Sequence, residues 1–83
     1  MNADCVVSML NELRQQRPPV FMADERERWL SSIGAFIANM TDSAQRMRAI
    51  NTVALDLWAA YGMRRDVAVF TVQVAVFAAE VRA

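Results

Sequence analysis

Apolar side chains recur along this chain with the spacing of helices, and turn-forming residues divide the pattern into four segments. The first is predicted to span about Ala3–Gln16 and carries three apolar residues at helical spacing: Val6, Leu10 and Leu13. It ends at Pro18-Pro19, because the residue before a proline avoids the helical conformation and a proline donates no backbone hydrogen bond. The connector that follows holds three apolar residues that we expect to pack on the core: Val20, Phe21 and Met22.

The second segment has the clearest predicted start. Asp24 and Glu27 are spaced as a capping box, so we expect Asp24 to cap a helix. Its apolar stripe comprises Trp29, Ile33, Phe36, Ile37 and Met40. A band of small residues lies on another side: Ser31, Ala35 and Ala38, with Gly34 beside them. A glycine within a helix costs about 1 kcal/mol relative to alanine, so Gly34 marks either a close backbone approach or a tolerated surface position.

The third segment follows the capping cluster Thr41-Asp42-Ser43. Its apolar residues repeat with the helical period: Met47, Ile50, Ala54, Leu57, Trp58 and Tyr61. Gly62 suits the left-handed residue that closes a helix, and Asp66 is expected to cap the next one. We expect Trp29, Trp58, Met40 and Met47 in the core, and Met9 and Met63 at the surface.

The fourth segment, residues 67–79, is apolar at eleven of its thirteen positions. Its many β-branched residues raise the propensity for a strand. However, the run is long for a strand, ends in the helix-favouring AAEVRA, and has no partner strand elsewhere in the sequence. The pattern therefore favours a helix, with a strand as the alternative.

As a helix, this segment is apolar on two opposite faces, which is typical of a helix buried on both sides. The face with large residues comprises Val67, Phe70, Val74, Phe77 and Val81, and we expect it to fill the core. The face with small residues comprises Ala68, Val72, Ala75, Val76 and Ala79, and we expect it to be an interface with another copy or a partner. In the alternative, the first helix covers the small face and the segment is entirely core.

Together these segments predict an all-α fold, a small bundle of three to four helices that forms one domain over residues 1–83 and assembles as a homodimer. Composition supports the assembly. Apolar residues make up 55% of 83 residues, above the usual 45–50% or so, and so short a chain hides only about 60–65% of its surface. Some apolar surface is therefore expected to need a partner.

Charge argues against a nucleic-acid partner, because nine arginines balance nine acidic residues and lysine is absent. The alternative function is a small DNA-binding transcriptional regulator, since residues 55–73 superficially resemble a helix-turn-helix. Its second helix would have to read bases with valine, alanine and phenylalanine, which lack the polar groups required. Two arginine pairs could still touch phosphates: Arg46 with Arg48, and Arg64 with Arg65.

Candidate chemistry is sparse. The chain has no histidine, lysine-based phosphate loop or paired cysteines, and Cys5 has no histidine to activate it. The acids Asp24, Glu25 and Glu27 are better explained as solvated helix-start residues than as metal ligands. We therefore predict no catalytic, cofactor-binding or metal residues, no cofactor, and a protein that is not an enzyme.

The apolar C-terminal run is also too short to span a membrane, at roughly 20 Å against about 30 Å of hydrocarbon. No secretory signal or disulfide pattern is evident, so we expect a cytoplasmic protein. The function that remains is a non-catalytic protein–protein interaction module whose partners are itself and another, unknown protein. Size and composition suit a small bacterial or phage accessory regulator, inhibitor or chaperone-like protein.

Overall fold

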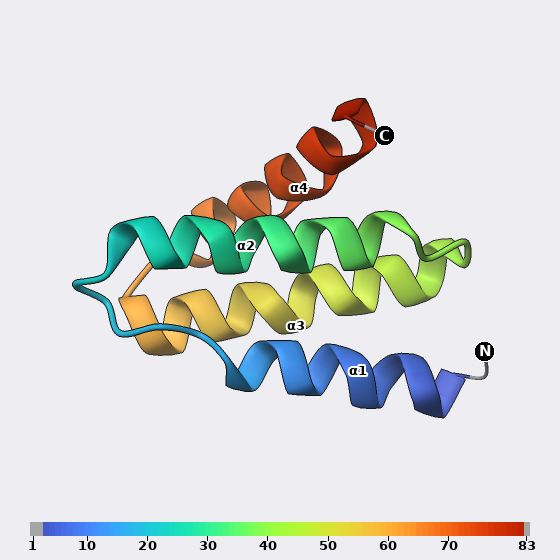
Figure 1. Ribbon diagram of the computed structural model, residues 1–83, viewed down its shortest axis with the longest axis horizontal. Coiled ribbons are helices and arrows are strands. Elements are labelled where there is room, and N and C mark those ends of the chain that lie inside the picture. Colours follow the sequence, from blue (N-terminus) through green and yellow to red (C-terminus); the bar gives the residue numbers. More distant parts are fainter. Residues whose placement is uncertain (1–2, 83) are drawn as a thin grey trace.

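Four α-helices joined by short connections form the part of the chain that the computed structural model describes, residues 3–82 (Figure 1). The helices are α1 (Ala3–Gln15), α2 (Ala23–Ala38), α3 (Ser43–Tyr61) and α4 (Arg65–Arg82). No strand occurs among the described residues. The predicted all-α fold is confirmed, and so is the helical assignment of residues 67–79.

Helices α1, α2 and α3 lie alongside one another, while α4 crosses behind α2 and its C-terminal end projects beyond the bundle (Figure 1). α4 packs chiefly on α2 and next on α3, whereas α1 packs on α2 and α3. The alternative in which the first helix covers α4 is therefore wrong. α2 and α3 occupy that position instead.

The core lies where α2, α3 and α4 meet. Its largest fully buried side chains are Ile33, Ile37, Val53, Leu57 and Val72. Trp29 and Met40 are also buried, as predicted. By contrast, Trp58 is 52% exposed and Met47 49% exposed, so their predicted core positions are wrong.

These two errors have one cause. Met47 and Trp58 lie eleven residues apart, on the same edge of the apolar stripe of α3, and both side chains are exposed, so the described helices leave that edge open. For the methionines expected at the surface, Met9 is exposed, but Met63 is half-buried and packs against the core.

Two helix boundaries follow the predicted signals. The Asp42 carboxylate accepts hydrogen bonds from the backbone N–H groups of Ala44 (2.9 Å) and Gln45 (3.2 Å), which caps α3. At the other end of α3, Gly62 has φ 67° and ψ 20°, the left-handed conformation that only glycine adopts without strain. The backbone N–H of Gly62 donates to the Trp58 carbonyl at 3.1 Å.

The predicted capping residues of α2 and α4 lie inside the helices. α2 is preceded by Met22, which provides no side-chain cap, so the predicted capping role of Asp24 is wrong. The reason is a turn in which the Met22 N–H bonds to the Pro19 carbonyl (3.1 Å), so that the helix already begins at Ala23. Likewise Asp66 is the second residue of α4, and its carboxylate accepts from the adjacent Val67 N–H at 2.9 Å.

Candidate interaction surface

The face of α4 with small residues is buried inside the subunit. Ala68 and Val72 are fully buried and Val76 is 4% exposed, while Ala75 and Ala79 are partly buried. We predicted this face as an interface, and the burial of these residues within their own chain overturns that assignment. α2 and α3 cover the face that a second copy was expected to cover.

The close approach of α2 and α4 at Gly34 explains why the small face is buried. A Cβ at Gly34 would lie 2.5 Å from the carbonyl oxygen of Ala75 and 2.6 Å from its carbonyl carbon. Gly34 therefore marks a close backbone approach, which was one of its two predicted explanations. At this spacing, the facing side of α4 has room for alanine and valine but not for phenylalanine.

The large apolar residues of α4 consequently face outward. We name this surface the α4 seam: Val67 (45% exposed), Phe70 (65%), Val74 (47%), Phe77 (65%) and Val81 (66%). The prediction that these residues fill the core is wrong. Their successive spacings of three and four residues place them at the a and d positions of a heptad repeat, the spacing of a helix that pairs with another helix.

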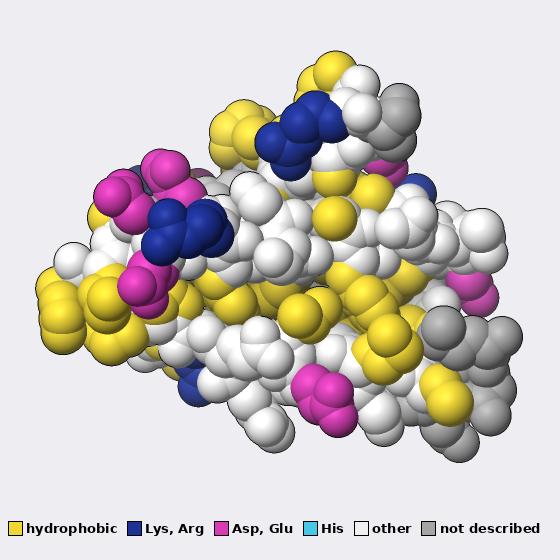
Figure 2. Space-filling model, in the orientation of Figure 1, with side chains coloured by type: hydrophobic (Ala, Val, Ile, Leu, Met, Phe, Trp, Pro, Cys, Tyr) yellow, Lys and Arg dark blue, Asp and Glu magenta, His cyan; other side chains and the backbone are white. Residues whose placement is uncertain are grey.

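The α4 seam is large for a chain of this size. Taking about 200 Å² for a phenylalanine side chain, the five side chains together expose roughly 500 Å² of mostly apolar surface. The largest apolar patch of a monomer commonly reaches about this size and is often functional. Figure 2 shows apolar side chains at the projecting end of α4 and along the boundary between α1 and α2.

One edge of the α4 seam is polar, and Glu80 on this edge ties α4 to α3. Its carboxylate accepts a hydrogen bond from Arg46, and the two form an ion pair. Gln73, one heptad earlier on the same edge, is exposed. Arg46 is thus engaged within the chain, and Arg64 pairs with Asp66 (3.1 Å), so each arginine pair considered for phosphate contact has one member in an ion pair.

A bidentate ion pair attaches α1 to α3. The Arg14 Nε donates to one carboxylate oxygen of Asp56 at 2.7 Å, and Nη2 donates to the other at 3.0 Å. Asp56 is the one buried charged residue among those described. The hydrogen bond to Asp56 raises the pKa of Arg14 although burial opposes the rise, so the guanidinium stays charged.

A second cluster joins the end of α3 to α2 and to the connector before it. The Tyr61 hydroxyl donates to the Pro18 carbonyl at 2.6 Å, and the Arg26 guanidinium lies 5.3 Å from the centre of the Tyr61 ring. Trp29 meets Tyr61 edge to face, with ring centres 6.4 Å apart, and its indole N–H donates to the Leu13 carbonyl at 2.7 Å. Burial raises the pKa of Tyr61, although the positive charge of Arg26 opposes the rise.

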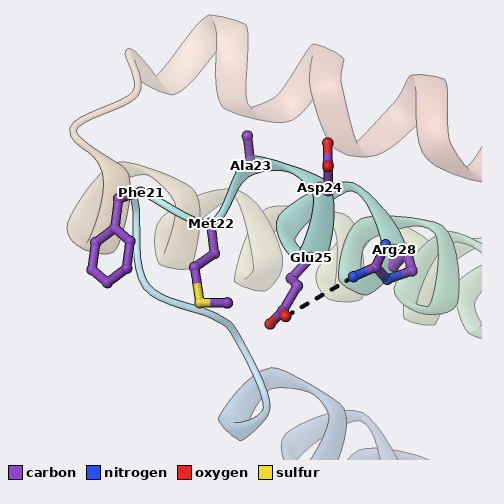
Figure 3. A pocket seen from close by; sticks show the side chains of 6 residues that line it. All are labelled: Phe21, Met22, Ala23, Asp24, Glu25 and Arg28. Atoms are coloured by element: carbon purple, nitrogen blue, oxygen red, sulfur yellow. Dashed lines mark ion pairs between the residues drawn. The ribbon is translucent and has the colours of Figure 1, made fainter.

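The described residues contain no group of three or more histidine, cysteine or acidic side chains placed to hold a metal ion. The Cys5 thiol is exposed. An open depression of about 410 Å³ lies at the start of α2, lined by Phe21, Met22, Ala23, Asp24, Glu25 and Arg28 (Figure 3). Within residues 3–82, no helix has the length and apolar character needed to cross a bilayer.

Comparisons with known proteins add no family to this description: no family model, curated protein or solved structure matches the chain. The assignment of the α4 seam as a contact surface therefore depends on the exposure and spacing of its residues. Sequence reasoning found the residues of the α4 seam as one group but assigned them to the core. The signal that identifies the buried face is Gly34 within its band of small residues, which requires an equally small surface opposite.

Proposed function

We propose that this chain is a non-catalytic protein–protein interaction module that acts as a homodimer, with the α4 seam as its contact surface. The observation that carries the proposal is the exposure of five large apolar side chains in a continuous heptad pattern on α4. Leaving such a stripe in water is unfavourable by about 25 cal/mol per Å², so covering it stabilises any complex that does so.

A second copy of the chain fits this surface because a heptad stripe is self-complementary. Valine occupies the three a positions of the seam (Val67, Val74 and Val81), the residue type found at these positions in two-stranded coiled coils, while Phe70 and Phe77 stand at the d positions where such coils carry leucine. Pairing two seams about a two-fold axis would bury about 1,000 Å² in total, the lower limit for a specific interface. Another protein with an apolar helix could use the same surface, which suits an accessory regulator, inhibitor or chaperone-like role.

The DNA-binding alternative receives less support from the geometry. α4 occupies the place of a recognition helix, and its outward face presents phenylalanine and valine, which offer no hydrogen bonds to base edges. Protein contact is therefore the function that this face favours.

Sedimentation velocity tests the homodimer. We expect the wild-type chain to sediment as a dimer at micromolar concentration, and the double variant F70Q/F77Q to sediment as a monomer with unchanged helical circular dichroism. Met9→Gln is the matched control, because Met9 is a similarly exposed apolar residue (43%) on α1, away from the seam. A monomeric wild type, or a double variant that stays dimeric, would contradict the proposal.

A further inference from the structure

The connector between α1 and α2 holds two further apolar side chains in solvent. Phe21 is 82% exposed and Val20 55% exposed, so the prediction that this connector packs on the core is wrong. The connector is attached to the rest of the chain through its backbone, because the Pro18 and Val20 carbonyls accept hydrogen bonds from Tyr61 and Arg26, while the side chains of Val20 and Phe21 stay in solvent. An aromatic side chain exposed to this degree is a candidate contact residue.

The backbone around Phe21 is held in place by three hydrogen bonds. Tyr61 donates to the Pro18 carbonyl (2.6 Å), Arg26 Nη1 donates to the Val20 carbonyl (3.1 Å), and the Met22 N–H donates to the Pro19 carbonyl (3.1 Å). The two adjacent prolines further restrict the chain. Because the loop is already ordered, seating Phe21 in a partner would require little additional loss of conformational entropy.

Acidic charge accompanies Phe21. Figure 3 shows the side chains of Phe21, Met22 and Glu25 projecting to the same side of the ribbon, with Asp24 on the opposite side. The Glu25 carboxylate is 4.0 Å from Arg28, a loose and exposed pair that leaves it available to another cation. Phe21 and Glu25 together form a projection, which we call the Phe21 knob. The partner surface that fits this knob is therefore an apolar hollow beside a basic group.

Such a hollow occurs on the same chain. The α1–α3 groove has a volume of about 340 Å³, at the low end of clefts that hold a small ligand. Its apolar lining includes Val6, Val7, Leu10, Met40 and Ala49. Arg48 also lines the groove and makes no ion pair among the described residues, whereas Arg14 is already paired with Asp56.

We propose that Phe21 of one copy inserts into the α1–α3 groove of another copy, with Glu25 beside Arg48. The connector lies at one end of the molecule and the groove lies toward the other, where α1 begins and α2 joins α3 (Figure 1). Phe21 therefore cannot reach the α1–α3 groove of its own chain. The contact is head-to-tail, so it extends assemblies instead of closing a pair.

This contact is independent of the α4 seam, because it uses α1, α3, the connector and the start of α2. The first experiment is sedimentation equilibrium up to roughly 1 mM, where weak self-association becomes populated. We expect the average mass of wild type to rise with concentration above the mass of the α4 seam dimer, and that rise to be absent in Phe21→Ala. Val20→Ala is the matched control within the same connector and should behave as wild type. A wild type without the rise, or a Phe21→Ala variant that keeps it, overturns the proposal.

A mixing experiment tests the head-to-tail geometry. Phe21→Ala retains the groove but lacks the knob, and Val7→Arg retains the knob but carries a charge in the groove. In the F70Q/F77Q background, which removes the α4 seam contact, neither variant should associate alone, but the mixture should form the single remaining contact. If wild type associates and the mixture does not, the contact is not head-to-tail and the proposal fails.

A charge exchange tests the role of Glu25. Glu25→Arg should weaken the association several-fold, and adding Arg48→Glu should restore it. Failure of the second change to rescue the first would place Glu25 against another group and overturn the pairing. The seam variant F70Q/F77Q should still show the concentration-dependent growth, so failure of the homodimer and failure of this contact give different results.

Discussion

Gly34 is the residue at which α2 and α4 come closest, and it decides which face of α4 is buried. Any side chain there would overlap the backbone of Ala75, which cannot move aside as the end of a flexible side chain can. Helix propensity alone would favour alanine at this position by about 1 kcal/mol. The glycine therefore indicates that packing outweighs propensity at this point.

Gly34→Ala should consequently destabilise the fold. Overpacking against the Ala75 backbone should cost more free energy than the helix propensity of alanine gains. We therefore expect a net loss of about 1–3 kcal/mol in the free energy of unfolding. Urea denaturation followed by circular dichroism measures this loss. Ser31→Ala, an exposed position of the same small-residue band, should change stability by less than about 0.5 kcal/mol. An unchanged or raised stability of Gly34→Ala would show that α4 does not approach α2 this closely.

Tyr61 predicts how stability responds to alkaline pH. Burial raises its pKa above the ordinary value of about 10, so the folded chain holds the hydroxyl proton more tightly than the unfolded chain does. The contribution is complete below pH 10 or so and is lost as the pH rises through the folded pKa. The chain has one tyrosine and no lysine, and arginine remains charged, so few other groups titrate in this range.

The melting temperature of wild type should therefore fall as the pH rises from about 9.5 to 11, and that of Tyr61→Phe should fall less. At neutral pH, Tyr61→Phe loses about 1 kcal/mol in the free energy of unfolding, because its hydrogen bond to Pro18 is missing. This offset is the same at each pH, so it cancels when the two slopes are compared. Equal alkaline slopes in the two proteins would show that the Tyr61 hydroxyl is not buried.

At the scale of the element, the sequence predicted an all-α bundle of three to four helices, and the structure has four among its described residues. Pro18-Pro19, Asp42 and Gly62 are local signals whose effect depends on adjacent backbone, and each acts as expected. The prediction for Asp24 failed because the turn at Pro19 places the N-cap of α2 at Met22, two residues earlier, and a hydrogen bond outside the helix is not visible in the capping pattern.

The two aspartates therefore give a paired prediction. Asp42→Ala removes two hydrogen bonds to orphan N–H groups and should cost about 1 kcal/mol, whereas Asp24→Ala, without a capping bond, should cost no more than a few tenths. Denaturant midpoints measured at one protein concentration test both changes. A loss for Asp24→Ala as large as that for Asp42→Ala would indicate that Asp24 caps α2 after all.

At the scale of the whole molecule, the sequence showed that α4 has two apolar faces and that three other helices cover only one of them. It did not show which one, because hydrophobicity is similar on both faces and the choice depends on interhelical distance. Side-chain volume determines which face is buried, because the alanine–valine face fits against Gly34 and the phenylalanine face does not. A carboxylate at buried Val72 should therefore prevent folding, whereas one at exposed Phe70 should not.

The difference between the buried and the exposed face of α4 also links stability to association. If two copies cover each other's α4 seam, unfolding also separates them, so the melting temperature of wild type should rise with protein concentration. F70Q/F77Q leaves the core of each subunit intact, since both side chains are 65% exposed, and should melt at a temperature independent of concentration in the micromolar range, where the weaker Phe21 contact is not populated. The two curves should converge on dilution, because the isolated subunit gains little from either phenylalanine. Differential scanning calorimetry over a hundred-fold range of concentration measures both trends, and parallel flat lines would mean that the α4 seam remains uncovered.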